Sequence, residues 1–121
     1  MWGMILSLST SDYEQMIAWA KQDYPEECCG LLWGQGAMKI TSVERAENIA
    51  IEKCVEFEID PKNIINASKR ERSSGYKVMG YFHSHPNGLE EPSLYDAQCA
   101  EEVGKVWIII TNDILLSLIH I

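Results

Sequence analysis

The chain has 121 residues and a formal net charge of −8, from 10 Lys and Arg against 18 Asp and Glu. This length indicates one domain, residues 1–121, and the ordinary shares of 46% hydrophobic and 23% charged residues exclude a disordered, collagen-like or coiled-coil chain. The acidic balance argues against nucleic-acid binding, because contacts to phosphates depend on Lys and Arg.

Hydrophobic periodicity and turn residues predict strands and helices in alternation. In chain order we expect a strand at 4–8, a helix from Ser11 to about Asp23, strands at 29–33, 37–45 and 54–59, a helix from Pro61 to about Arg72, a strand at 78–83, a helix from Ser93 to Gly104, and a hairpin of strands at 107–110 and 114–120. Two helix starts carry capping signals: Ser11 and Glu14 have capping-box spacing, and Asp60 precedes Pro61. Since the alternation is not a regular βαβ series, we expect an α/β fold with one mixed sheet flanked by helices.

The segment 54–59 alternates apolar residues with glutamates, which is typical of a half-buried strand. We expect Val55, Phe57 and Ile59 to point into the core. In the strand at 37–45, Ile40 should do the same.

Cysteine use and the two ends of the chain indicate the compartment. The four cysteines include the adjacent pair Cys28 and Cys29 but form no C-x-x-C, which excludes a zinc ribbon and favours buried free thiols in a reducing compartment. The apolar start, 1–8, lacks the basic region of a signal peptide, and the apolar stretch 106–121 is interrupted and too short to span a bilayer. We therefore expect a cytoplasmic protein without membrane contact.

Two of the three histidines lie in the segment His83-Ser84-His85-Pro86. In an extended chain the side chains of residues i and i+2 point to the same side, so both imidazoles can converge on one metal ion. Pro86 disfavours helical geometry at His85 and helps keep the segment extended. A pair of polar residues at the end of a strand is the purely structural interpretation, and it applies to most isolated H-x-H segments.

A carboxylate follows at a distance that fits a third ligand. Asp96 would lie in the first turn of the helix that begins at Ser93, where the helix dipole stabilises negative charge. The spacing of Ser93 and Asp96 is also that of a capping box, and the two interpretations are compatible. Two histidines and one carboxylate leave the fourth tetrahedral position to water, as in catalytic zinc sites, where the pKa of that water falls to near 7.

Hydrolysis by such a site also needs a general base. The acidic pair Glu26 and Glu27 directly precedes the apolar strand at 29–33, so a carboxylate lies at the margin of a buried strand. A solvated turn is the alternative interpretation, and it suits Glu26 well.

Together these segments resemble the JAMM motif of the JAMM/MPN-plus (JAB/Mov34) zinc metallopeptidases, in their short prokaryotic form. The resemblance rests on Glu27-x-Cys29-Gly30-Leu31-Leu32, on His83-Ser84-His85-Pro86, on the seven residues from Pro86 to Pro92, and on Ser93-x-x-Asp96. The segments Asn48-Ile49-Ala50 and Phe57-x-Ile59-Asp60-Pro61 are also similar to short members of the family.

The resemblance implies an MPN/JAB fold, which is cytidine-deaminase-like, and one Zn²⁺ per chain held by His83, His85 and Asp96. It implies that Glu27, with one residue between it and Cys-Gly, is the general base toward a zinc-bound water that acts as the nucleophile. Ser93 would stabilise the oxyanion. The implied activity is a zinc-dependent peptidase or isopeptidase that hydrolyses the bond after the C-terminal glycines of a ubiquitin-like protein, including sulfur carriers, with no nucleic-acid or membrane partner.

The alternative is a non-catalytic MPN-type binding or scaffold module, which the complete set of motif residues disfavours. A zinc deaminase is excluded, because its H-x-E and P-C-x-x-C signature is absent from this sequence.

Overall fold

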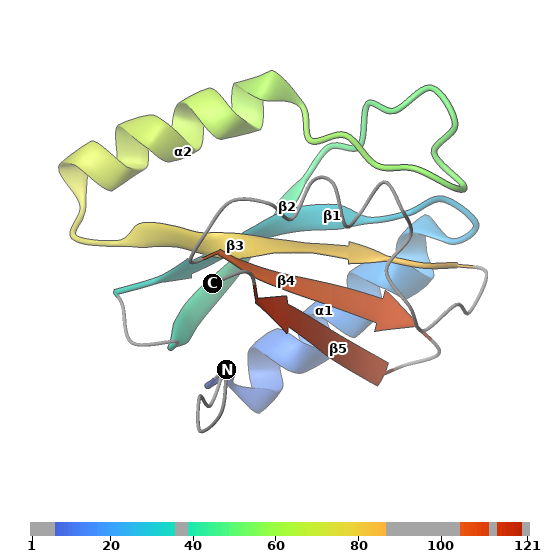
Figure 1. The fold of residues 1–121 in the computed structure, drawn as a ribbon, viewed down its shortest axis with the longest axis horizontal. Coiled ribbons are helices and arrows are strands. Elements are labelled where there is room, and N and C mark those ends of the chain that lie inside the picture. Colours follow the sequence, from blue (N-terminus) through green and yellow to red (C-terminus); the bar gives the residue numbers. More distant parts are fainter. Residues whose placement is uncertain (1–6, 36–38, 87–104, 112–113, 120–121) are drawn as a thin grey trace.

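The computed structural model has, within the residues it describes, a five-stranded sheet and two helices (Figure 1). The structure describes residues 7–35, 39–86, 105–111 and 114–119, the last of these as backbone only. The elements in chain order are α1 (Thr10–Asp23), β1 (Cys29–Gly34), β2 (Ile40–Ala46), α2 (Pro61–Ser73), β3 (Lys77–Ser84), β4 (Val106–Thr111) and β5 (Ile114–Ile119). In this part of the chain, no helix has the length and hydrophobicity needed to cross a membrane.

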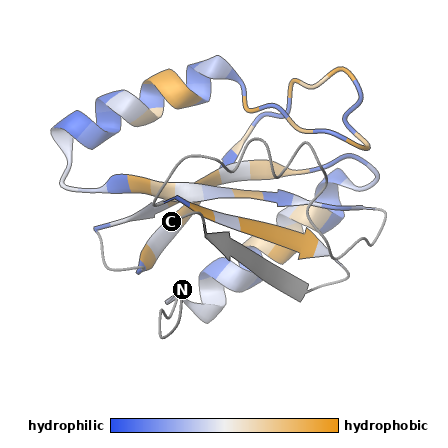
Figure 2. Ribbon diagram, viewed as in Figure 1, coloured by the Kyte–Doolittle hydropathy of each residue, from blue (hydrophilic) through white to orange (hydrophobic). Residues whose placement is uncertain are grey.

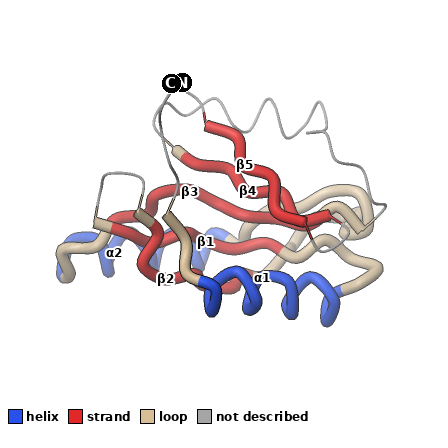
Figure 3. Tube along the Cα trace, turned by 90° about the horizontal axis from the view of Figure 1, so that it is seen from below, coloured by secondary structure: helices blue, strands red, loops and turns tan. Residues whose placement is uncertain are grey.

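The sheet is mixed, as the sequence predicts, and its strand order is β2-β1-β3-β4-β5 (Figure 3). β1 runs antiparallel to both β2 and β3, β3 runs parallel to β4, and β5 is antiparallel to β4. The carboxyl ends of β3 and β4 therefore meet at one edge of the sheet, and β1 begins at that same edge.

The two helices cover opposite faces of the sheet. Leu32 of β1 belongs to a buried cluster with Met16 of α1, whereas the neighbouring Leu31 belongs to a cluster with Ala67 of α2. Successive side chains of a strand point to opposite faces, so α1 and α2 must lie on different sides. β4 is buried along its whole length, and its described residues are almost uniformly hydrophobic (Figure 2), as a strand buried on both faces requires.

Several predicted boundaries are confirmed. α1 ends at Asp23, just before Pro25, and α2 begins at Pro61 with Asp60 as its cap. The Lys62 backbone N–H donates to the Asp60 carboxylate at 2.9 Å. β4 and β5 pair as an antiparallel hairpin. The predicted helix from Ser93 lies outside the described residues.

The predicted capping box at the start of α1 is wrong. The helix begins at Thr10 instead, and the Ser9 hydroxyl accepts the Asp12 backbone N–H at 3.0 Å. Ser11 and Glu14 lie inside the first turns, because another serine two residues earlier reaches the free amides first. Of the predicted strand at 4–8, residues 4–6 lie outside the described part, and Ser7 forms a single bridge to Lys39.

The segment 54–59 is a loop, so the predicted strand is wrong. Phe57 is buried as expected, but Val55 is 58% exposed. Only one isolated bridge, between Asn48 and Ile59, ties the described segment to another strand-like stretch. The predicted alternation holds at Phe57. The Glu56 carbonyl and the Glu58 N–H, however, bond to the Asn48 side chain, and the Glu58 carbonyl accepts the Ile49 backbone N–H, so this stretch has no regular strand ladder.

β3 and β4 approach so closely at Gly80 that a side chain does not fit between them. A Cβ on Gly80 would overlap the carbonyl oxygen of Val106 and lie 2.7 Å from its nitrogen, and both are backbone atoms that cannot rotate away. We expect Gly80→Ala to lower the free energy of unfolding by about 3 kcal/mol or more, at the upper end of the range for overpacking.

The control is Gly75→Ala, where the nearest atom to the new Cβ is the Gln35 side-chain nitrogen at 3.9 Å. That variant should stay within about 0.5 kcal/mol of the wild type. Urea denaturation of the three proteins measures the difference. Equal midpoints for the two variants would contradict the close approach of β3 and β4.

Candidate active site

The histidine segment 83–85 is held from both sides at the edge where β3 ends. On one side the Ser84 backbone N–H donates to the Cys28 carbonyl at 3.0 Å, and the Cys28 N–H donates to the Ser84 hydroxyl at 2.8 Å. On the other side the His85 N–H donates to the carbonyl of Ile110 in β4 at 2.9 Å. The segment is therefore an extension of the sheet, and its backbone is as fixed as a strand interior.

The two imidazoles lie close enough to share one ion. The Nε2 atoms of His83 and His85 are 3.2 Å apart, and the residues are only 0% and 7% exposed. Two nitrogens bound at about 2.0–2.1 Å to the same tetrahedral ion would be separated by about 3.3 Å. The spacing of this pair fits joint ligation of zinc, and neutral imidazole nitrogens are suitable donors.

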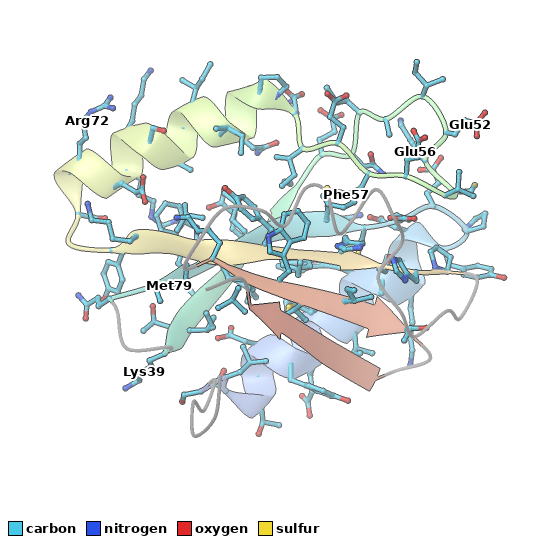
Figure 4. All side chains as sticks on the ribbon, in the orientation of Figure 1. Lys39, Glu52, Glu56, Phe57, Arg72 and Met79 are labelled. Carbon is cyan, nitrogen blue, oxygen red and sulfur yellow. The ribbon has the colours of Figure 1, made fainter. Side chains whose placement is uncertain are left out.

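Aromatic side chains enclose the ring of His83. Phe57 stacks on it with a centroid distance of 4.3 Å and an interplanar angle of 18°, and Trp107 meets it edge-on at 6.0 Å. Figure 4 shows Phe57 between its loop and the sheet. These contacts fix the plane of the imidazole and keep water from one side of the site. The sequence marks Phe57 only as an inward-facing residue, because its contact with His83 depends on the path of the loop.

Glu27 and Glu26, which compete for the role of base in the sequence, have different surroundings. Glu27 is 5% exposed, whereas Glu26 is exposed. Cys29 pairs with His83 in the antiparallel ladder. If the same register continues for two residues beyond this pair, Glu27 lies opposite His85. Directly opposite residues share a face of the sheet, and alternation puts Glu27 on the same face as both histidines.

Of the five predicted site residues the structure describes three: it brings His83 and His85 together, and the strand register puts Glu27 on the same face of the sheet. The other two, Ser93 and Asp96, fall in the stretch 87–104, which the structure does not describe. Among the described residues there is no group of three metal-ligating side chains. The third ligand and the oxyanion residue therefore stay predictions.

Two cavities adjoin these residues. One of about 290 Å³ lies beside His85 and Pro86 and is also lined by Lys21 and Tyr24 near the end of α1. The other, about 450 Å³, reaches Glu27 and is lined mainly by charged side chains of both signs. Each cavity borders one predicted group, and among the described residues neither is lined by both Glu27 and a histidine.

The cysteines near the site are poor nucleophiles. Burial raises the pKa of Cys28 to about 11 and that of Cys29 to about 12, so both thiols are protonated at neutral pH. Both are free and buried, as the sequence predicts, but Cys54 is exposed on the loop that was expected to be a strand. Nucleophilic chemistry by cysteine is thereby disfavoured next to the histidines.

Comparison with known proteins adds independent information. The family model described as prokaryotic homologs of the JAB domain matches residues 9–118. A protein named desampylase from Haloferax volcanii is 31% identical over 113 residues, which cover 89% of this chain and 81% of that protein. A histone deubiquitinase from Branchiostoma floridae is 32% identical over 77 residues, which are 60% of this chain but only 9% of that protein.

Solved structures with the same fold span nearly the whole chain. A protein from Desulfitobacterium hafniense superposes with a TM-score of 0.75 at 27% identity, covering 97% of this chain and 92% of that one. A JAB1/MPN domain protein from Archaeoglobus fulgidus gives a TM-score of 0.58 at 23% identity, covering 89% and 76%. The fold is therefore that of the JAB/MPN domains.

The raised thiol pKa values predict selective alkylation. At pH 8 a pKa of about 11 leaves on the order of one thiolate in a thousand, and a pKa of about 12 leaves fewer still. We expect iodoacetamide to modify Cys54 in the native protein and to spare Cys28 and Cys29 until the chain is unfolded. Peptide mass spectrometry reads out the sites, and native labelling of Cys28 at the rate of Cys54 would show that the pair is accessible.

Proposed function

Because this chain belongs to the family of prokaryotic homologs of the JAB domain, we propose that it is a zinc-dependent peptidase or isopeptidase. The bond cut is the one after the C-terminal glycines of a ubiquitin-like protein, such as a sulfur carrier. The observation that carries the proposal is the pair of imidazole nitrogens 3.2 Å apart on the face that also holds the buried Glu27. The similarity to proteins named desampylase and deubiquitinase supports the substrate class.

His83 and His85 would hold the zinc ion together with Asp96. A zinc ion in such a site acts as a Lewis acid that polarises the scissile carbonyl. Glu27 takes the proton from the attacking water and returns it to the leaving amine, so its carboxylate serves first as base and then as acid. Ser93 donates a hydrogen bond to the oxyanion that develops on the carbonyl oxygen.

The described residues supply the rigidity that this chemistry needs. The ring of His83 packs against Phe57 and Trp107, and the backbone of His85 is bonded to β4. Glu27 lies outside the strand itself, yet its backbone N–H donates to the Lys53 carbonyl at 2.7 Å. A base and a ligand pair that hardly move relative to each other need little reorganisation during proton transfer.

We expect one zinc ion per chain in the purified protein, and its loss in His83→Ala and in Asp96→Ala, since either change leaves too few ligands for tight binding. Elemental analysis after dialysis measures the stoichiometry. His120→Ala, which removes the histidine outside the motif, is the matched control and should keep its zinc. Stoichiometric zinc in both ligand variants would refute the ligand assignment, and a wild type that takes up no zinc would favour the scaffold interpretation.

We expect Glu27→Gln to keep its zinc and to lower turnover about 10²- to 10⁴-fold, the usual contribution of a positioned acid or base. The assay follows release of an amide-linked fluorophore from the terminal glycine of a ubiquitin-like protein. The neighbouring and exposed Glu26 gives the control variant, Glu26→Gln, which should turn over at the wild-type rate. Wild-type turnover in Glu27→Gln would remove Glu27 from the role of base.

A further inference from the structure

Asn48 joins three separate stretches of backbone through its side chain. Its Nδ2 donates to the carbonyl of Glu27 at 3.0 Å and to the carbonyl of Glu56 at 3.1 Å. Its Oδ1 accepts the backbone N–H groups of Ala50 and Glu58, both at 3.0 Å. The backbone also joins the two ends of the loop 47–59, through bonds from the Ile49 N–H to the Glu58 carbonyl and from the Asp60 N–H to the Glu47 carbonyl. The Asn48 side chain adds the bonds that link this loop to Glu27.

Only an asparagine side chain can make this set of bonds at this size. Its amide has two donor hydrogens and two acceptor lone pairs, and all four are used here. The orientation of the amide is determined by its partners, because the flipped amide would set NH₂ against two N–H groups and oxygen against two carbonyls. An aspartate keeps the shape and both acceptors but loses both donors.

The bonds to Asn48 matter most at Glu27. This residue lies two positions before β1 begins at Cys29, so regular ladder bonds to neighbouring strands do not hold it. Instead its N–H donates to the carbonyl of Lys53 and its carbonyl accepts from Asn48. Both backbone polar groups of Glu27 are therefore bonded to one loop, and Asn48 organises that loop.

The same loop also contacts the metal-ligand pair. Phe57 lies between Glu56 and Glu58, the two residues whose backbones bond to Asn48, and its ring stacks on His83. The position of Glu27 and the aromatic wall of His83 are thus coupled through the Asn48 amide. A shift of this amide would change the distance from the base to the site without removing a ligand.

We propose that Asn48 is a positioning residue for catalysis, which sets the place of Glu27 relative to the histidine pair through its bond to the Glu27 carbonyl. The inference rests on the proposed function, in which Glu27 is the base. Since Asn48 acts on the base and not on the metal or on substrate binding, its loss lowers kcat and leaves KM and zinc content unchanged.

The test variant is Asn48→Asp, whose carboxylate oxygen would face the carbonyls of Glu27 and Glu56 in place of a donor. We expect kcat to fall about 10- to 100-fold, the scale of a misplacement near 1 Å. The control is Ser74→Ala, which likewise removes a bond from a backbone N–H, that of Tyr76, to a side-chain oxygen, but lies beyond the end of α2 and lines neither cavity beside the site residues. The control should keep kcat within twofold.

A double-mutant cycle separates positioning from a merely structural role. In the Glu27→Gln background there is no base left to position, so adding Asn48→Asp should lower kcat no further. A second loss of the same size in that background would overturn the inference, because the effect would then not pass through Glu27. Wild-type kcat in the single variant Asn48→Asp would overturn it as well.

The cycle also keeps this inference distinct from the proposed function. If Glu27→Gln alone leaves turnover unchanged, the assignment of the base fails, whatever Asn48 does. If Asn48→Asp does not fold, as shown by circular dichroism, Asn48→Ser takes its place in the cycle. Serine is uncharged and keeps one hydroxyl, so we expect a smaller fall in kcat with the same dependence on Glu27, and additivity would again overturn the inference.

Discussion

The antiparallel pairing of β1 with β3 is the constraint on which the site depends. It sets Cys29 opposite His83, and the ladder continues through two further hydrogen bonds between Cys28 and Ser84. Because side chains alternate along a strand, this register decides that Glu27 and the two histidines share one face. A slip of one residue would turn the acid to the other side of the sheet and separate it from the imidazoles.

The other strands and the two helices stabilise the pairing of β1 with β3. β3 is central, with β1 on one side and β4 on the other, and β4 is buried on both faces. The helices cover the two faces separately, so the site edge is left at the carboxyl ends of the parallel pair β3 and β4. The polar groups at this edge rest on a rigid apolar interior. A hydrolytic site benefits from such support, because its groups must keep a fixed geometry.

The loop 47–59 is an irregular segment whose backbone groups are bonded to several other segments. Its backbone groups bond to the amide of Asn48 and to the segment around Glu27, and each such bond contributes about 0.5–1.5 kcal/mol. The stacking of Phe57 on His83 anchors the loop to the sheet. The contacts of this loop are therefore linked to the proposed function, since Asn48 bonds to the predicted base and Phe57 packs on the ring of a predicted ligand.

The sequence by itself determined the class of fold and the motif. Short-range properties specify several elements, such as the apolar runs of β1 and β4 and the cap Asp60 at α2. The spacing of His83 and His85 indicates a metal site, because the alternation of side chains in an extended chain is also a local rule. The sequence does not predict the cap at Ser9 or the loop at 54–59. The first depends on competition between nearby serines and the second on whether a partner strand is present, and neither is a local property. Only the tertiary structure shows that Glu27 is buried while Glu26 is exposed. Only it brings Phe57 to His83 and Asn48 to Glu27, since both contacts join segments far apart in the chain.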